Sequence, residues 1–497
     1  MSTFAGCPHH VLDAFAALFD ELSRQRLSEL ELADLLEELL TPAGEYLQAE
    51  LHRTIRPEAE AWGSLAEDVR TRIDNAVTAG PAENLTLLAA LLVLDSILGE
   101  VWNITGWSFP ASSVGLAKLR QELIESAVWI CPRSGGILVP RRSKPMCDPD
   151  STAPETLQDV LTVLRLPHDT ARDIAWIRLR PNEDVDVTSS GEEVRILSIP
   201  FLAEFEDVTL KPDMVTSTRH GYISEHVVKL EMRVNPSLQA IKEEVASSSV
   251  PTVVLLPELA LNDTIVEKWR TELGSDATDS LHNVGWLVIG SGPHNGTKKP
   301  GASAGPIRNT RNGRKMWPNR VVVLSRTGRV LAVGDKRYGF SIPRSLWKAY
   351  GIDGRKLPDR LEKLSEGMIH GRQLTVMEST LGRVALVICE DLGRLENLLK
   401  LLKHAGVSIV LNPIFATPIK DRQWTATVSS FLRQADITTV TCNGLARTED
   451  VELKKPTIVA FDPHQKDWSR IGDPAKPLKG KRIEQALTAR SLPIRSR

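Results

Sequence analysis

The sequence predicts a protein of two parts, a helical N-terminal region followed by an α/β domain. In the first 130 residues apolar side chains recur at helical spacing, as at Val11, Phe15, Leu18 and Leu22. Beyond residue 194, short apolar runs typical of buried strands alternate with amphipathic helical stretches. That alternation predicts an α/β domain whose buried sheets are covered by helices.

The composition is that of an ordinary globular protein of 497 residues, with 42% hydrophobic and 25% charged residues. A net charge of -2 provides no general attraction to nucleic acid or to an anionic membrane surface. Five scattered cysteines include no CxxC pair, so neither a disulfide framework nor a zinc site is predicted. The first ten residues do not resemble a signal peptide, and the apolar window 85–94 is too short to cross a bilayer. We therefore expect a cytoplasmic protein without a membrane partner.

The region 1–130 is predicted to be a helical domain of unknown role. Ser28 and Glu31 have the spacing of a capping box at the start of one helix. The run from Leu85 to Leu98 is apolar nearly all round, which is typical of a central buried helix. Because no catalytic pattern occurs here, the region is expected to pack on the rest of the chain or to bind a protein partner.

Changes in composition divide the remaining chain into three segments. Residues 131–193 are rich in Pro, Gly, Ser and basic side chains, and are predicted to be a linker with a short helix and strand. Residues 194–475 carry the strand and helix pattern. Residues 476–497 are predicted to be a basic, loosely ordered tail.

The α/β pattern consists of eight expected strands and four expected helices. The strands are 194–200, 252–257, 286–291, 320–324, 384–389, 408–411, 438–442 and 457–461, and the helices are 237–246, 265–273, 395–404 and 424–435.

Three strand ends carry reactive side chains. Glu258 follows a buried strand and a proline in LLPELAL, where an unpaired buried carboxylate would be costly. Lys336 follows a hairpin-like strand in GRVLAVGDKRYG, and Cys389 follows a buried strand in GRVALVICEDLGR. A single strand cysteine is more often core filling, which is the prediction for Cys442. A base and a cation at neighbouring strand ends would instead make Cys389 a nucleophile.

These three motifs, in this order, resemble those of the carbon–nitrogen hydrolase (nitrilase/amidase) superfamily over about residues 194–461. WLVIGS, NRVVVLSRTGRVL, GVSIVLNPIFATP and FLRQADITTVTCNGLA are similar to further parts of that family's pattern. The resemblance implies a four-layer αββα sandwich, a homo-oligomer, and hydrolysis of a non-peptide C–N bond without cofactor or metal. The first 190 residues lie outside it.

The resemblance also implies roles for the three residues. Cys389 would attack the substrate carbonyl and form a thioester, and Glu258 would act as the general base and acid. Lys336 would stabilise the oxyanion, together with a backbone N–H near Cys389 or near Asn412.

The family adds a second glutamate between the lysine and the cysteine. Glu362 and Glu366 both have suitable spacing, and Glu362 is preferred because LEK is similar to carbamoyl-amide hydrolases of the family. The segment 340–371 is longer and more charged than usual, and residues 211–233 look like an insertion.

The substrate is expected to be a small molecule with an amide or carbamoyl group rather than a nitrile. The motifs imply that Glu390, Asn412 and Phe415 contact it. The sequence CEDL resembles the glutaminase domain of glutamine-dependent NAD synthetases, so one alternative is a glutaminase that supplies ammonia to a partner enzyme. Another is a catalytically silent scaffold or sensor whose helical domain recruits a partner. Nucleic acid is not an expected partner.

Overall fold

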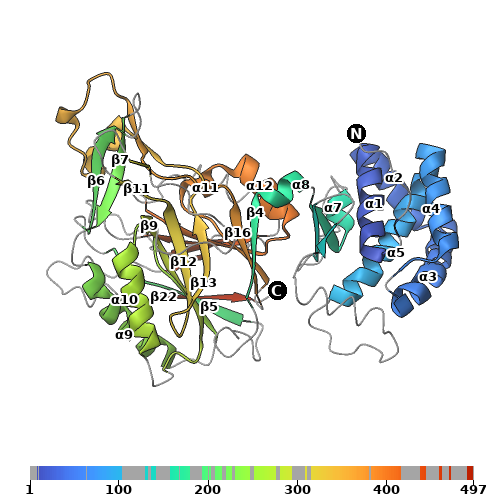
Figure 1. The fold of residues 1–497 in the computed structure, drawn as a ribbon, viewed down its shortest axis with the longest axis horizontal. Coiled ribbons are helices and arrows are strands. Elements are labelled where there is room, and N and C mark those ends of the chain that lie inside the picture. The colour runs from blue at the N-terminus through green and yellow to red at the C-terminus, as the bar shows by residue number, and fades with distance from the viewer. Residues whose placement is uncertain are drawn as a thin grey trace. The chain divides into compact units, whose positions relative to one another are not determined.

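The computed structural model (Figure 1) contains helices and several sheets, which confirms the α/β class. It describes residues 8, 10–62, 64–102, 129–131, 136–140, 157–166, 168–179, 193–199, 201–202, 207–214, 220–226, 230–246, 251–275, 280–293, 308–309, 315–379, 382–415, 437–443, 458–461, 469–471 and 490–495. The chain forms two compact units, residues 1–172 with 404–406, and residues 173–403 with 407–497.

The first unit contains a bundle of helices around α5. The helices are α1 (Val11–Arg24), α2 (Glu29–Leu39), α3 (Pro42–Trp62), α4 (Glu67–Ala79) and α5 (Asn84–Trp102), with the 3-10 helix η1 (Gly80–Glu83) before α5. The predicted capping box of α2 is confirmed, because Ser28 Oγ accepts from Glu31 N–H and the Glu31 carboxylate accepts from Ser28 N–H. Helix α5 contacts all four other helices, and this position explains why its sequence is apolar nearly all round.

Within the described residues, the stretch Glu67–Gly99 is long and apolar enough to span a membrane by length and composition. In the structure 61% of its most apolar window is buried among the other helices of the unit. Packing inside a helical bundle therefore accounts for its composition.

Much of the predicted linker belongs to the first unit. The strands β1 (Trp129–Ile130), β2 (Ile137–Pro140) and β3 (Val163–Leu166) form an antiparallel sheet, with the short helices α7 (Leu157–Val160) and α8 (His168–Arg172) nearby in sequence. Asp95 of α5 accepts hydrogen bonds from the backbone N–H groups of Thr162, at 2.8 Å, and Val163, at 2.7 Å. The prediction of a linker over 131–193 is thus wrong for this part. Its short apolar strands supply a sheet that shares the bundle's core.

The second unit contains a six-stranded sheet with the order β13-β12-β9-β8-β5-β22. Its strands are β5 (Glu193–Ser198), β8 (Thr252–Leu255), β9 (Val284–Pro293), β12 (Asn319–Ser325), β13 (Val330–Asp335) and β22 (Arg490–Arg495). The central strands β5, β8 and β9 are parallel, whereas β12, β13 and β22 pair antiparallel with their neighbours.

Strand β22 corrects the prediction of a loosely ordered C-terminal tail. All six of its residues pair with β5 at the edge of the sheet. An edge strand tolerates Pro493, which has no backbone N–H to donate to a second neighbour.

A seven-stranded sheet has the order β21-β20-β19-β18-β17-β16-β4. Its strands are β4 (Ile174–Arg178), β16 (Leu374–Ser379), β17 (Gly382–Leu386), β18 (Ile409–Ile414), β19 (Thr438–Asn443), β20 (Ile458–Phe461) and β21 (Ser469–Ile471). Strands β17, β18 and β19 are parallel, so their carboxyl ends meet at one edge.

The two large sheets share an apolar core. Leu255 of β8 lies in the same cluster as Leu386 and Leu411 of the seven-stranded sheet. Val254, the residue before Leu255 on β8, faces the opposite side of the sheet. It packs in the apolar cluster that includes residues of α9 (Val234–Ala246) and α10 (Asp263–Gly274). Helix α12 (Leu395–His404) is also present, whereas the predicted helix 424–435 lies outside the described residues. The fourth layer of the sandwich therefore stays a prediction.

A smaller sheet with the order β14-β15-β7-β6 includes two strands from the region of the predicted insertion. Strands β6 (Val208–Met214) and β7 (His220–His226) form an antiparallel hairpin, and β14 (Ser341–Pro343) and β15 (Lys363–Glu366) complete the sheet. The remaining short elements are η3 (Leu230–Arg233), η4 (Arg344–Leu346), η5 (Lys348–Tyr350), η6 (Gly354–Lys356), α11 (Glu390–Gly393), β10 (Arg308–Asn309) and β11 (Lys315–Met316). The parallel pairing of β7 with β15 places Tyr222 opposite Glu366.

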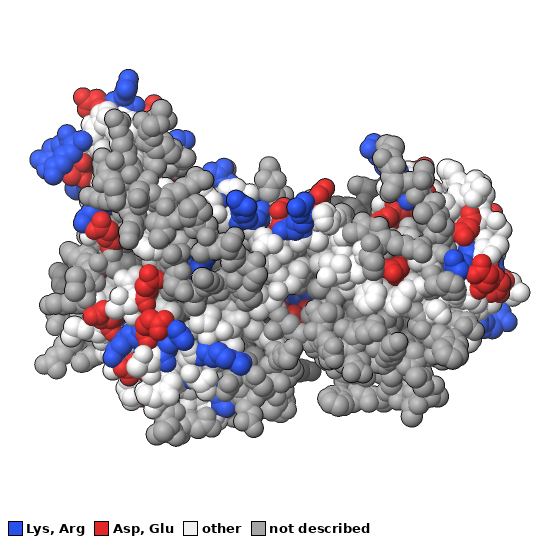
Figure 2. Space-filling view, viewed as in Figure 1, with Lys and Arg blue, Asp and Glu red and all other residues white. Residues whose placement is uncertain are grey.

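On the face drawn in Figure 2, basic and acidic side chains of the described residues lie in small mixed groups. This arrangement agrees with the near-neutral net charge of the chain.

Candidate active site

Cys389 lies in a strained turn between β17 and α11. Its φ of 47° and ψ of -108° form a conformation that a residue with a Cβ rarely adopts. The Cys389 N–H donates to Asn412 Oδ1 at 2.9 Å and to the Pro413 carbonyl at 3.1 Å. Strained backbone of this kind persists only where the surroundings hold it, and here bonds to the end of β18 do so.

Glu258 lies on a loop that follows β8 and runs close to β9. The loop approaches two glycines of β9 so closely that a Cβ on Gly290 would lie 2.1 Å from the Pro257 carbonyl oxygen. A Cβ on Gly292 would lie 1.9 Å from the Leu261 carbonyl oxygen. Because these two glycines of the WLVIGSG run have no Cβ, they leave room for the loop that carries Glu258.

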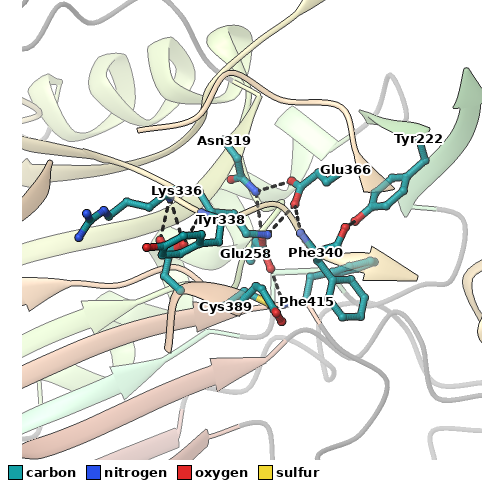
Figure 3. Close-up of polar contacts among 12 residues, drawn as sticks. Tyr222, Glu258, Asn319, Lys336, Tyr338, Phe340, Glu366, Cys389 and Phe415 are labelled. Atoms are coloured by element: carbon teal, nitrogen blue, oxygen red, sulfur yellow. Dashed lines mark hydrogen bonds and ion pairs between the residues drawn. The ribbon is translucent and has the colours of Figure 1, made fainter. Parts of the chain in front are cut away.

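Lys336 follows β13 directly and joins two carboxylates. Its Nζ lies 2.7 Å from Glu258 Oε1 and 2.7 Å from Glu366 Oε2, and all three side chains are largely buried (Figure 3). A buried ammonium shared by two carboxylates has little freedom to reorient. It thus provides a positioned positive charge beside Cys389.

Asn319 and two backbone groups complete the cluster. Asn319 Nδ2 donates to Glu258 Oε1 at 2.8 Å and to Glu366 Oε1 at 3.0 Å. The Phe415 N–H donates to Glu258 Oε2 at 2.9 Å, and the Phe340 N–H donates to Glu366 Oε2 at 3.1 Å (Figure 3). Both carboxylates are therefore oriented by several donors.

The structure corrects the preference between the two rival glutamates. Glu362 is exposed, and its backbone carbonyl accepts from Arg344 N–H at the start of η4. Glu366, at the end of β15, points to Lys336. Glu366 is the last residue of β15 and lies opposite Tyr222 of β7, whereas Glu362 precedes the strand.

The pKa values of the three central groups are strongly perturbed. Burial raises the pKa of Glu258, and the nearby Glu366 carboxylate raises it further, although Lys336 opposes both effects. Burial alone would lower the pKa of Lys336, but Glu258 and Glu366 outweigh burial and raise it well above its usual value. Burial and then the Glu258 carboxylate raise the pKa of the Cys389 thiol. The resting site therefore holds a neutral thiol, a charged lysine and an unusually basic carboxylate.

Asp391 connects the nucleophile's turn to the lysine's strand end. One carboxylate oxygen accepts from Tyr338 N–H at 2.7 Å, and both accept from Arg337 N–H at 3.0 Å. Burial raises the pKa of Asp391 to about 7, although these backbone donors oppose the rise. Because Asp391 is two residues from Cys389 and its donors follow Lys336, it holds the two functional segments together.

The three residues expected to contact substrate have different positions. Phe415 lines the cavity beside Cys389, as a contact residue would. Asn412 does not line it: this fully buried side chain accepts from Cys389 N–H, and its amide donates to Thr441 Oγ1 at 3.4 Å. The Glu390 side chain is directed to Arg394, at 3.3 Å. Among the described residues neither Asn412 nor the Glu390 side chain lines the cavity, so their contact with substrate stays a prediction.

The cavity beside Cys389 is small and largely apolar. Its described lining consists of Leu210, Tyr222, Glu258, Leu259, Lys336, Phe340, Tyr350, Glu366, Cys389 and Phe415. Its volume is about 10 Å³, which is room for about one water molecule.

The sequence patterns do not indicate several contributors to the site, among them Tyr222, Asn319, Tyr350 and Asp391. Asn319 begins a buried strand. Because a buried polar side chain needs a hydrogen-bond partner, its position could have indicated a role in the site. Tyr222 lies in the predicted insertion 211–233, and Tyr350 lies in the long, charged segment 340–371. The sequence pattern indicates no role for either residue. Among the described residues, no group of three or more His, Cys, Asp or Glu side chains could hold a metal ion.

No protein-family model and no curated protein matches the chain. Among solved structures it is similar to Nit3 of Saccharomyces cerevisiae, a member of branch 10 of the nitrilase superfamily, at 12% identity and a TM-score of 0.37, over 62% of this chain and 93% of Nit3. It is also similar to the C. elegans NitFhit protein (14%, 0.34, 62% of each chain) and to an amidase from Nesterenkonia sp. (13%, 0.32, 63% of this chain and 93% of the amidase). At such identities and TM-scores these likenesses have no bearing on the chemistry of this chain.

Proposed function

We propose that the chain hydrolyses a non-peptide C–N bond, of an amide or carbamoyl compound, through a thioester on Cys389. One observation carries this proposal: Cys389 and Glu258 line the same small cavity, where Glu258 is paired with Lys336 at 2.7 Å between Oε1 and Nζ. A nucleophile, a base and a positive charge thus converge beside one cavity, as acyl transfer requires.

In the acylation step Glu258 takes the proton of the Cys389 thiol as the sulfur attacks the carbonyl carbon. A C–S bond forms, and the carbonyl electrons move onto the oxygen. Lys336 stabilises this oxyanion, because its charge is fixed in place before the reaction. When the C–N bond breaks, Glu258 returns the proton to the leaving nitrogen.

A backbone donor for the oxyanion is also needed. The Cys389 N–H already donates to Asn412 and Pro413, and the Phe415 N–H donates to Glu258. The N–H of Glu390, directly after the nucleophile, is our candidate for this donor.

In the deacylation step water attacks the thioester while Glu258 accepts its proton. The C–S bond breaks, the acid leaves, and the sulfur regains its proton. Glu366 supports both steps, since its charge compensates Lys336 and keeps Glu258 basic. The CEDL sequence after the strand favours an amide or carbamoyl substrate over a nitrile.

Intact mass spectrometry tests the proposal directly. The purified chain is incubated with amides, carbamoyl compounds and glutamine, and with an activated ester whose leaving group needs no proton. We expect an acyl adduct that maps to Cys389 and is absent in Cys389→Ala. In Glu258→Gln the adduct from the ester should persist, because water is no longer activated.

Cys442→Ala is the matched control, since it removes a buried thiol of the same domain and should keep the adduct. Ammonia release from glutamine only after a partner enzyme is added would favour the glutaminase alternative. If no adduct or ammonia is found with any compound, the hydrolase proposal fails and a silent scaffold becomes the better interpretation.

A further inference from the structure

The β6–β7 hairpin contributes directly to the cavity. In its antiparallel register Leu210 pairs with Ser224, and Pro212 pairs with Tyr222. Paired residues share a face, so Leu210 and Tyr222 lie on one side of the hairpin, and both line the cavity. Thr209 lies on the other side and is exposed.

Contacts with the catalytic cluster hold the hairpin in this place. Tyr222 pairs with Glu366 across the parallel strands, and its carbonyl accepts from Gly367 N–H at 2.7 Å. The Tyr222 hydroxyl lies 3.4 Å from the Phe340 carbonyl oxygen (Figure 3). The segment that carries Glu366 therefore also sets the position of Tyr222.

The remaining walls leave little space for a large acyl group. The Tyr350 ring lies 6.1 Å from the Phe340 ring and 6.3 Å from the Phe415 ring, measured between centroids, and is tilted by 52° and 56°. These are spacings of rings in mutual contact, so no group fits between them. Together with Leu210 and Tyr222 they line the cavity, whose volume is about 10 Å³.

The charges around this space disfavour a charged acyl group. Among the described lining residues the one cation, Lys336, is shared by Glu258 and Glu366, so carboxylates outnumber it. An anionic acyl group would face these carboxylates without a further cation among the described lining residues, and a cationic one would compete with Lys336 after losing its water.

We propose that Leu210 and Tyr222 form the wall that sets the cavity's selectivity, and that they restrict it to short, uncharged acyl groups. This inference rests on the proposed function, because it describes the substrate of the same thiol. The proposed selectivity excludes glutamine, and other amides whose acyl portion carries a charge, from the substrates of Cys389.

Alkylation of Cys389 tests the charge selectivity without requiring turnover. Iodoacetamide and iodoacetate have nearly the same size and differ by one negative charge. Their rates at Cys389 of the full chain are measured by peptide mass spectrometry, and each is divided by its rate with free cysteine. We expect the normalised ratio to favour iodoacetamide by about tenfold or more. A ratio near one, or one that favours iodoacetate, would overturn the exclusion of anionic groups.

A series of straight-chain primary amides tests the size selectivity. In the wild type, kcat/KM should fall about tenfold for each methylene beyond the longest chain that fits. Leu210→Ala and Tyr222→Leu should move this limit to longer chains, whereas Thr209→Ala should keep the wild-type profile. Leu210→Val makes the same test with a smaller change if the other variants do not fold.

A limit that does not move in folded Leu210 and Tyr222 variants would show that the hairpin is not the selective wall. If amides of every length acylate Cys389 equally well, the proposed hydrolase stands and this inference fails. If the cavity discriminates between the iodo reagents but no amide is hydrolysed, the hydrolase proposal fails and the charge selectivity stands.

Discussion

Cys389 and Cys442 show what separates a reactive thiol from core filling in one domain. Both lie near the carboxyl ends of parallel strands of the seven-stranded sheet. Cys442 is fully buried between the sheets, with its sulfur 2.9 Å from Ser198 Oγ and 3.5 Å from the Leu255 carbonyl oxygen. Cys389 lies past the strand end, in a strained turn beside a cavity.

Burial raises the pKa of both thiols, and that of Cys442 reaches about 12. Burial alone therefore yields an inert thiol. The difference is that Cys389 has a carboxylate to receive its proton, and Lys336 and Asn319 hold that carboxylate in place. The neighbours of the thiol, rather than its position at a strand end, therefore make Cys389 the nucleophile.

The largest expected effect comes from removing each thiol in turn. Cys389→Ala should lower kcat by about 10⁴-fold or more, because the covalent route is lost. Cys442→Ala should change kcat by less than about twofold, since this thiol touches no reacting group. Steady-state ammonia release measures both. Equal losses in the two variants would contradict the assignment of the nucleophile.

The second prediction applies the same contrast to the two glutamates. Glu366→Gln should lower kcat by about 10²-fold, because the charge of Lys336 then acts on Glu258 alone and makes it a weaker base. The acid limb of the pH–rate profile should also move to lower pH. Glu362→Gln, at an exposed position, should match the wild type in both measurements. An unchanged acid limb in Glu366→Gln would count against this role.

The third prediction concerns Asp391 and the pH dependence of stability. Its pKa is raised to about 7, so the folded state keeps a proton that the unfolded carboxyl, with a pKa of about 3.9, has lost. The stability contributed by this group is fully present below about pH 4 and is lost as the pH rises through about 7. The free energy of unfolding of the wild type minus that of Asp391→Asn should therefore fall by about 2 kcal/mol between about pH 5 and about pH 8.

Urea denaturation at the two pH values measures this difference. Asp359→Asn, at an exposed position, is the control for the substitution of an aspartate by asparagine. A difference that rises with pH would mean that the backbone donors of Arg337 and Tyr338 outweigh burial at Asp391.

The smallest expected effect is on the backbone strain at Cys389. Glycine adopts a positive φ without steric cost, so Cys389→Gly should be more stable than Cys389→Ala by about 1 kcal/mol. At Cys442, in an extended strand, glycine should instead be less stable than alanine by about 1 kcal/mol. Thermal unfolding of the four variants measures both differences. A Cys389→Gly variant that is less stable than Cys389→Ala, as expected at Cys442, would show that the Cys389 turn is not strained.

The local elements of the α/β domain could be predicted because each is encoded in consecutive residues. Helices 265–273 and 395–404 and strand 438–442 correspond closely to α10, α12 and β19. The sheet within the predicted linker 131–193 is not evident from the sequence. Its strands Ile137–Pro140 and Val163–Leu166 are too short to be predicted before their pairing is known. The C-terminal strand was missed for the same reason, since its partner β5 lies far away in the sequence.

The sequence by itself determined which reactive groups end the buried strands: Glu258 after a proline, Lys336 after a hairpin strand and Cys389 before a turn. Only the tertiary structure decided that Glu366 rather than Glu362 meets Lys336, and that Asn319, Asp391 and Tyr222 surround them. The physical reason is that strand ends follow from local hydrophobic patterns. Which side chains meet depends on the pairing of distant strands, and a shift of one residue turns every side chain to the other face.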